Sequence, residues 1–150
     1  MMDIKAINKY LKTLENSLLK TIKIDIELNR QWSSKFPDEP GVYIFFEKDK
    51  IVYVGETSSI KKRMINILDT RHHTIRRKIG KFNFSTNPKY SKAASKPKFL
   101  PELEKTINNW MTSKMKLSFL PIYLGRKELE AYITKEHKPK YNSPSKRGRK

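Results

Sequence analysis

Two tyrosines stand ten residues apart in the chain, and each lies in a triplet with a glycine. They are Tyr43 in Gly-Val-Tyr (41–43) and Tyr53 in Tyr-Val-Gly (53–55). A phenol can orient water or a phosphate, and a nearby cation can lower its pKa from the usual value of about 10. Taken alone, such tyrosines are also typical of ordinary aromatic side chains half-buried on a sheet.

The net charge of the chain narrows the class of its partner. The 150 residues include 33 Lys and Arg against 15 Asp and Glu, which gives +18 at pH 7. An excess this large indicates a polyanion, nucleic acid before an anionic membrane surface. The three histidines lack metal-ligand spacing with other donors, and the absence of cysteine excludes disulfides and a cysteine zinc site. No uncharged apolar run suggests a signal peptide or membrane span, so we expect a cytoplasmic protein.

Local patterns place the two tyrosines on a β-hairpin. Residues 42–47 and 51–55 are short, β-branched and aromatic, and a charged turn joins them. Side chains alternate between the faces of a strand, so the tyrosines share a face only if the loop has an odd length. We therefore predict a three-residue loop, 48–50, which pairs Tyr43 with Gly55.

The rest of the chain is mainly helical in pattern. Apolar residues at steps of three and four over 3–22 predict an amphipathic helix, which packs on the domain or, being partly heptad-like, contacts a second copy. After the hairpin we expect a helix capped by Thr57 or Ser58, and then a basic helix over about 70–79 that Gly80 ends. Further along we expect a helix from Pro101, an edge strand over 116–125 and a helix over 126–137. The expected fold is α/β of the α+β type, with a small three-stranded antiparallel sheet flanked by helices.

With these elements in place, the sequence resembles the GIY-YIG nucleases, a family named after two short motifs on neighbouring strands. The two glycine–tyrosine triplets match those motifs, and Arg63 stands ten residues after Tyr53, where the family has an arginine. In "ELEAYITKEHKPKYN", Glu130 precedes Asn142 by twelve residues, as a late glutamate and asparagine do in the family.

The resemblance covers about 41–68 and 116–142, and it departs from the family in two ways. Valine replaces isoleucine in both motifs, and 67 residues separate the arginine from the glutamate, more than in compact members. We expect an N-terminal amphipathic helix over 1–32 and a GIY-YIG-like domain over 33–142. The domain would carry a basic substrate-binding insertion at about 70–115, and 143–150 would be a basic disordered tail.

The resemblance implies phosphodiester hydrolysis and a role for each residue. Tyr43 would be the general base, and Arg63 would stabilise charge on the scissile phosphate. Tyr53 would orient water or phosphate, and Asn142 would position a catalytic group. Because a dense two-metal site needs more carboxylates, we assign Glu130 as the single protein ligand of Mg²⁺ or Mn²⁺.

Some of these assignments have rivals. Glu128 and Glu136 lie on the same expected helix as Glu130, which we prefer for its step to the late asparagine. Helical periodicity places Lys61 and Arg63 equally beside an apolar stripe, so only the resemblance selects the arginine.

Other basic residues are candidates for contact with a proton or a phosphate. His72 or His73 could shuttle a proton or contact a phosphate, and Lys62 could lower the pKa of a tyrosine. The expected nucleic-acid contacts are Arg71, Arg76, Arg77 and Lys78 in the basic helix, Lys92, Lys96 and Lys98 in the Lys/Pro-rich stretch, and Lys146, Arg147 and Arg149 in the tail.

We predict a metal-dependent endonuclease that hydrolyses phosphodiester bonds in DNA, restriction-like or repair-related. Cutting both strands would need a homodimer, which the N-terminal helix could supply. Two alternatives remain: a non-catalytic nucleic-acid-binding module of the same fold, and an RNA-binding basic protein.

Overall fold

The computed structural model describes residues 3–87, 99 and 101–142, and these contain one antiparallel sheet in the order β1-β4-β2-β3. The strands are β1 (Ile24–Asp25), β2 (Gly41–Glu47), β3 (Lys50–Thr57) and β4 (Met115–Pro121). The antiparallel sheet with flanking helices confirms the expected fold class, but the expected number of three strands is wrong. β1 was missed because its two residues, which pair with Lys116 and Leu117 of β4, are too few to show an alternating pattern.

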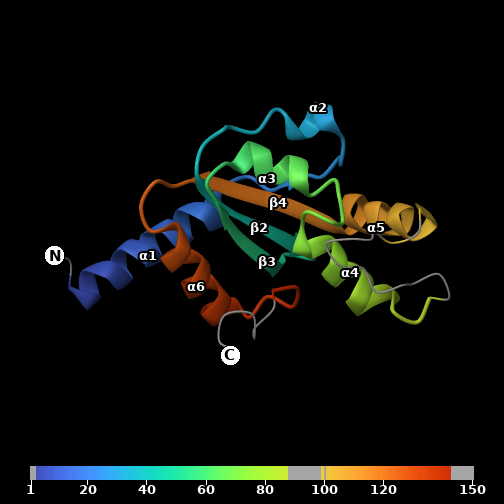
Figure 1. Ribbon diagram of the computed structural model, residues 1–150. Helices are drawn as coiled ribbons and strands as arrows, with labels where there is room; N and C mark the ends of the chain where they lie inside the picture. Colours follow the sequence, from blue (N-terminus) through green and yellow to red (C-terminus); the bar gives the residue numbers. More distant parts are fainter. Residues whose placement is uncertain (1–2, 88–98, 100, 143–150) are drawn as a thin grey trace.

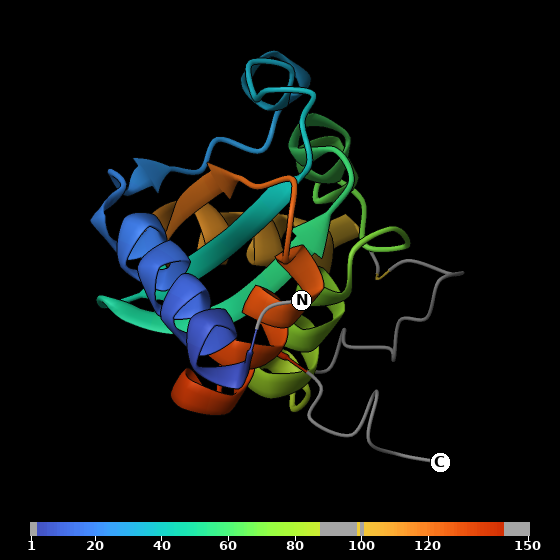
Figure 2. The same cartoon turned by 90° about the vertical axis from the view of Figure 1, so that its left-hand side faces the viewer.

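Helices cover both faces of this sheet, so the architecture has three layers (Figures 1 and 2). The helices are α1 (Ile4–Lys20), α2 (Arg30–Ser33), α3 (Ile60–Asn66), α4 (Thr74–Phe84), α5 (Pro101–Lys114) and α6 (Arg126–His137). α1 and α6 lie on one face, whereas α3, α4 and α5 lie on the other. Because both faces are covered, the first six residues of β2 are all buried.

Alternate residues of the hairpin feed two separate hydrophobic cores. Val42, Ile44 and Val54 pack with Leu18 of α1 and Leu129 of α6. On the opposite face, the two tyrosines and Phe45 pack with residues of α3, α4 and α5, among them Met64, Ile75 and Ile107. The tyrosines therefore lie between the sheet and the layer formed by α3, α4 and α5.

The hairpin register is as predicted, although its turn is not. Tyr43 faces Gly55 across the strands, so both tyrosines project from one face. Lys48 and Asp49 form a two-residue turn with φ of 50° and 65°, and Lys50 already belongs to β3. A two-residue turn alone would place the two tyrosines on opposite faces of the sheet. A bulge between Phe45 and Phe46 adds one residue to the pairing and returns both tyrosines to the same face.

Three boundaries differ from the sequence expectation. α3 takes Ser59 as its N-cap, through a bond from the Lys62 amide to the serine hydroxyl, rather than Thr57 or Ser58. Gly80 lies inside α4, where it makes room for a neighbouring ring: a Cβ at this position would lie 2.6 Å from Cζ of Phe99. The strand expected over 116–125 ends at Pro121.

The N-terminal helix packs on the sheet through its second half. Leu11 and Leu18 are buried in the second core, and the carboxylate of Glu15 bonds to Nε2 of His137 on α6 at 2.8 Å. The first half projects beyond the sheet, and Ile4 is 76% exposed. α1 thus packs against the sheet and α6 through this half.

Candidate active site

A glycine of the hairpin leaves room for one of the two tyrosines. Gly55 lies opposite Tyr43, and a Cβ added to Gly55 would lie 2.4 Å from both Cζ and the hydroxyl oxygen of that tyrosine. Any larger residue at position 55 would displace the ring. The pairing of a glycine in one motif with a tyrosine in the other therefore has a steric cause.

Two N–H donors converge on the hydroxyl oxygen of Tyr43. Nε of Arg63, on α3, donates to this oxygen at 3.2 Å. Nε2 of His73 lies 2.8 Å from it on the other side. Nδ1 of His73 accepts the amide of Ile75 and so caps α4, which leaves the ring proton on Nε2 and makes this nitrogen the donor to Tyr43.

The two adjacent histidines have different positions. His73 is fully buried, whereas the side chain of His72 is 59% exposed and lies near Asp69. His72 reaches the site only through its backbone oxygen, which accepts a bond from the guanidinium of Arg63 at 3.1 Å. Of the two histidines named from the sequence, the structure therefore brings the side chain of His73 to Tyr43.

Burial determines the acidity of both tyrosines. It raises the pKa of Tyr43 well above its ordinary value; the nearby Tyr53 raises this pKa further, while Arg63 lowers it. Burial also raises the pKa of Tyr53, and Arg63 opposes that rise. Both phenols are therefore neutral at pH 7, and the donors to Tyr43 would stabilise a negative charge there if its proton left.

The carboxylate of Glu130 joins this group from the other layer. α6 packs on the opposite face of the sheet, but Oε2 of Glu130 accepts the backbone amide of Glu56 at 3.2 Å, at the open edge of β3. Its charge also raises the pKa of Tyr53. The rivals Glu128 and Glu136 are exposed on α6.

Asn142 occupies the same strand edge as this carboxylate. Its side-chain oxygen accepts the Val54 amide at 2.9 Å, and its side-chain nitrogen donates to the Val54 carbonyl at 2.8 Å. The amide of the buried Tyr141 donates to the Val52 carbonyl. The backbone groups of residues 52, 54 and 56, on the edge of β3 away from β2, are thus hydrogen-bonded by α6 and the segment after it. These bonds give the edge strand a partner.

The basic residues named from the sequence occupy varied positions. Arg77 donates to backbone carbonyls of Thr70 and Arg71. Burial lowers the pKa of Arg77, and its electrostatic interaction with Tyr53 opposes that change. Arg71 pairs with Asp69, while Lys62 is exposed on α3. Lys78 is half-buried on α4, with Nζ 6.0 Å from the centroid of the Phe82 ring.

Arg76 is a core residue. It is 1% exposed and pairs with Glu104 of α5 at 2.7 Å, so it cannot face a nucleic acid and we leave it out of the phosphate contacts proposed below. The other expected contacts, Lys92, Lys96, Lys98, Lys146, Arg147 and Arg149, lie outside the described residues.

Two contributors to this region were missed by sequence reasoning. Tyr141 is buried, donates to Oε2 of Glu47 and holds β3 through its amide, yet its only sequence signal was its place beside Asn142. The electrostatic interaction between Arg77 and Tyr53 was also missed, because the two residues belong to different elements. Neither relationship can be derived from local spacing.

The donor set is compatible with one divalent cation. Among the described residues, no three His, Cys, Asp or Glu side chains gather into a cluster. Mg²⁺ can nevertheless bind through one or two carboxylates, with water and substrate phosphate completing its shell. Glu130 at the open strand edge, beside neutral phenols and guanidinium groups, fits a site with one protein carboxylate.

The class that this fold and site define is a GIY-YIG nuclease domain. The family model described as the GIY-YIG catalytic domain matches residues 33–147, and the chain belongs to this family. The resemblance inferred from the two motifs is therefore confirmed.

Curated relatives are proteins named UvrABC system protein C. The chain is 31% identical to that of Hydrogenobaculum sp. (strain Y04AAS1) over 114 residues, which are 76% of this chain and 15% of the relative. It is 43% identical to that of Caulobacter vibrioides over 44 residues, which are 29% of this chain and 7% of the relative. The chain thus spans a small part of the length of these proteins.

Among solved structures, the chain is similar to the GIY-YIG N-terminal endonuclease domain of UvrC from Thermotoga maritima, which is bound to magnesium. The TM-score is 0.41 at 23% identity, and the match covers 76% of this chain and 94% of that one.

Among the residues that the structure describes, no helix has both the length and the apolar character needed to cross a membrane.

Proposed function

We propose that this chain is a metal-dependent endonuclease that hydrolyses phosphodiester bonds in DNA. The observation that carries the proposal is the convergence of Arg63 and His73 on the hydroxyl of Tyr43, with Glu130 at the adjoining strand edge. Family membership and the net charge of +18 support a nucleic-acid substrate. We also propose that the protein acts inside the cell, in the cytoplasm.

Each residue of the site would have a distinct task in this reaction. Arg63 and Arg77 would hold the scissile phosphate, because guanidinium groups match phosphate oxygens in geometry and charge. Tyr53 is more exposed than Tyr43, at 8% against 1%, and would orient the phosphate or the attacking water. Glu130 would hold Mg²⁺ or Mn²⁺, which when bound supplies positive charge at the phosphate.

In its phenolate form, after its own proton has left to solvent, Tyr43 would take the proton of the attacking water. Its raised pKa makes the phenolate rare at neutral pH, so the two N–H donors from Arg63 and His73 matter: they stabilise negative charge on this oxygen without rearrangement. Asn142 would act through β3 as a positioning residue, because its side chain bonds the backbone between Tyr53 and Gly55.

The proposal is tested with supercoiled plasmid in Mg²⁺ or Mn²⁺, and with EDTA as the metal-free control. Glu130→Gln should abolish nicking, whereas the matched variant Glu128→Gln, on the exposed side of the same helix, should nick like the native chain. Retarded plasmid without nicking in either metal would instead support a non-catalytic binding module. Stronger competition by single-stranded RNA than by DNA would support the RNA-binding alternative.

A restriction-like or a repair-related role would be distinguished by the products. Mapping cleavage ends on a random-sequence plasmid would show whether cuts fall at one sequence, as a restriction enzyme requires, or at damaged sites added to the plasmid. The similarity to UvrABC system protein C favours the repair-related role.

Cleavage of both strands would require two copies of the chain. Ile4 and Ile7 lie on the half of α1 that projects from the sheet, with exposures of 76% and 36%, and would be where a second copy binds. Sedimentation of the native chain and of an Ile4→Glu/Ile7→Glu variant tests this dimer. A native chain that is monomeric at the concentrations that support cleavage would contradict it.

A further inference from the structure

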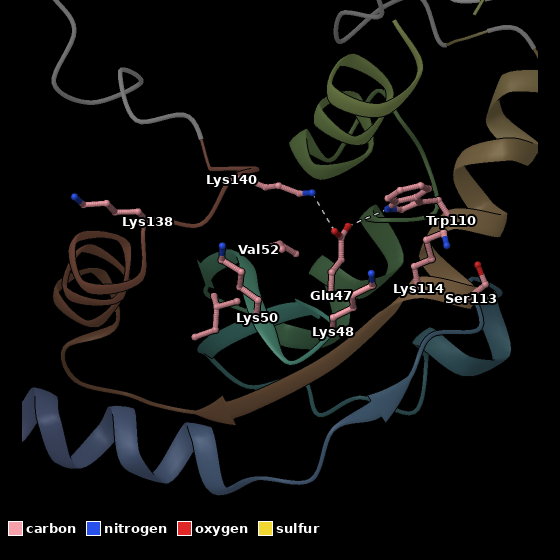
Figure 3. Close-up of a pocket in the computed structure, with 10 residues that line it drawn as sticks. Glu47, Lys48, Lys50, Val52, Trp110, Ser113, Lys114, Lys138 and Lys140 are labelled. Atoms are coloured by element: carbon pink, nitrogen blue, oxygen red, sulfur yellow. Dashed lines mark hydrogen bonds and ion pairs between the residues drawn. The ribbon is translucent and has the colours of Figure 1, made fainter.

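A basic groove lies at the turn end of the hairpin (Figure 3). Its volume is about 660 Å³, and its sides come from the β2–β3 turn, the end of α5 and the segment after α6. The charged residues that border it are Glu47, Lys48, Lys50, Lys114, Lys138 and Lys140. The groove therefore brings together five lysines from three separate segments of the chain.

The one carboxylate among these six residues is already engaged. Glu47 accepts a bond from Nε1 of Trp110 at 2.9 Å and pairs with Lys140 at 3.1 Å (Figure 3). It also accepts a bond from the hydroxyl of Tyr141 at 2.8 Å. Among the described residues, the ion pairs of the groove do not include the other four lysines. The groove thus carries positive charge that the described residues do not neutralise through ion pairs.

Two of the lysines adopt a backbone conformation that lysine disfavours. Lys48, in the hairpin turn, has φ of 50°, and Lys138, at the end of α6, has φ of 46°. Asparagine or glycine is the usual residue in such a turn, and glycine at such a helix end. Residues in such strained conformations cluster at functional sites, and here both strained lysines border the same groove.

We propose that this groove binds the phosphate backbone of DNA at a distance from the cleavage site. The proposal rests on the function proposed above, but it adds a second binding site to it. Glu47 follows Tyr43 by four residues on β2, which corresponds to about 13 Å along a strand. At 3.4 Å per nucleotide, the groove would hold a phosphate roughly four nucleotides from the scissile bond.

The groove recognises phosphate rather than bases. Lysines are point charges that attract phosphate without reading sequence. The indole N–H of Trp110 is already donated to Glu47, while Nζ of Lys114 lies 5.3 Å from the centroid of its ring and Phe84 meets it edge-on. Trp110 thus supports the wall of the groove, and the contribution of the groove to affinity should not depend on sequence.

The test uses the full chain, a fluorescein-labelled 20-base-pair duplex and EDTA, so that binding is measured without cleavage. Lys48→Asn/Lys138→Asn should reduce the slope of log affinity against log salt by about two, one for each lost phosphate contact. The same variant should unfold at a temperature equal to or above that of the native chain, because asparagine tolerates positive φ. A matched control, Lys5→Gln/Lys9→Gln, removes two charges from exposed positions on α1, which does not line the groove, and should keep the native slope.

The outcomes separate this proposal from the function itself. If the native chain nicks plasmid but the groove variant keeps the native salt slope, the groove proposal is wrong and the nuclease stands. If the variant loses affinity for an RNA of the same length but not for DNA, the groove is an RNA site and the proposal is likewise overturned. A chain that binds no duplex DNA at all would overturn both.

Discussion

The hydroxyl of Tyr43 lies against Gly55, in space that a side chain at position 55 would occupy. The distance from the position of such a Cβ to the tyrosine oxygen is 2.4 Å. This contact joins the two sequence motifs into one steric unit, because the tyrosine of the first fits only above the glycine of the second.

Gly55→Ala should therefore displace the tyrosine ring. We expect a loss of about 1–3 kcal/mol in the free energy of unfolding, as overpacking a close-packed site usually causes, together with a loss of plasmid nicking. The double variant Tyr43→Ala/Gly55→Ala provides the control, since alanine at position 55 should cost less stability once the ring is gone. Equal costs in the two backgrounds, measured by denaturant unfolding, would show that the contact is not the cause.

His73 should affect catalysis separately from its capping of α4. Asparagine can accept the Ile75 amide as an N-cap but is too short to replace Nε2 at the hydroxyl of Tyr43. His73→Asn should thus keep most of the native stability while lowering the nicking rate by about 10²-fold, the scale of losing one preorganised donor. His73→Ala should lose about 1 kcal/mol or more in addition, and His72→Ala should behave like the native chain in both assays. A His73→Asn variant with native activity would remove this residue from the site.

Asn142 should stabilise the edge of β3. Asn142→Ala removes both side-chain bonds to Val54 and should lower the free energy of unfolding by about 1–3 kcal/mol. The Val54 amide should also exchange its hydrogen faster, which distinguishes a loosened strand edge from general destabilisation. Asn109→Ala, on the exposed surface of α5, is the matched control. Unchanged protection of Val54 would contradict the positioning role.

The nicking rate should rise with pH across the neutral and mildly alkaline range. Burial raises the pKa of Tyr43, so its phenolate becomes more populated with every unit of pH and does not saturate below the raised pKa. We expect the log of the rate to climb steadily between about pH 7 and 9, with no plateau. Tyr43→Phe should abolish the activity at every pH. A flat profile in the native chain would show that this phenol is not the base.

Alkaline pH should weaken the fold for the same reason. The pKa values of Tyr43 and Tyr53 are raised in the folded state, so below the unfolded pKa of about 10 both states are protonated and the stabilising contribution is complete. Above that value the unfolded chain releases protons that the folded chain retains, and stability falls by about 1.4 kcal/mol per pH unit for each group. Denaturant unfolding from pH 9 to 11 should show this slope, and Tyr43→Phe should make it shallower.

The local sequence determined the main secondary-structure elements and the facing of the two motifs. Alternation and β-branching specified the hairpin, apolar spacing specified α1 and α6, and the parity argument gave the correct facing of Tyr43 and Gly55. These features follow from the periods of strands and helices, which the residues display wherever they are in the chain. The spacing of Glu130 and Asn142 also had local meaning, since both bond to the edge of one strand.

Tertiary structure alone decided how the site is assembled. The bulge between Phe45 and Phe46, which corrects for the short turn, is invisible in the pattern of residues. The convergence of Arg63 and His73 on Tyr43, the burial of Arg76 against Glu104, and the lysine groove all join residues from different elements. The physical reason is that periodicity reports which face of its own element a side chain occupies, whereas hydrogen bonds, burial and pKa depend on which other element packs against that face.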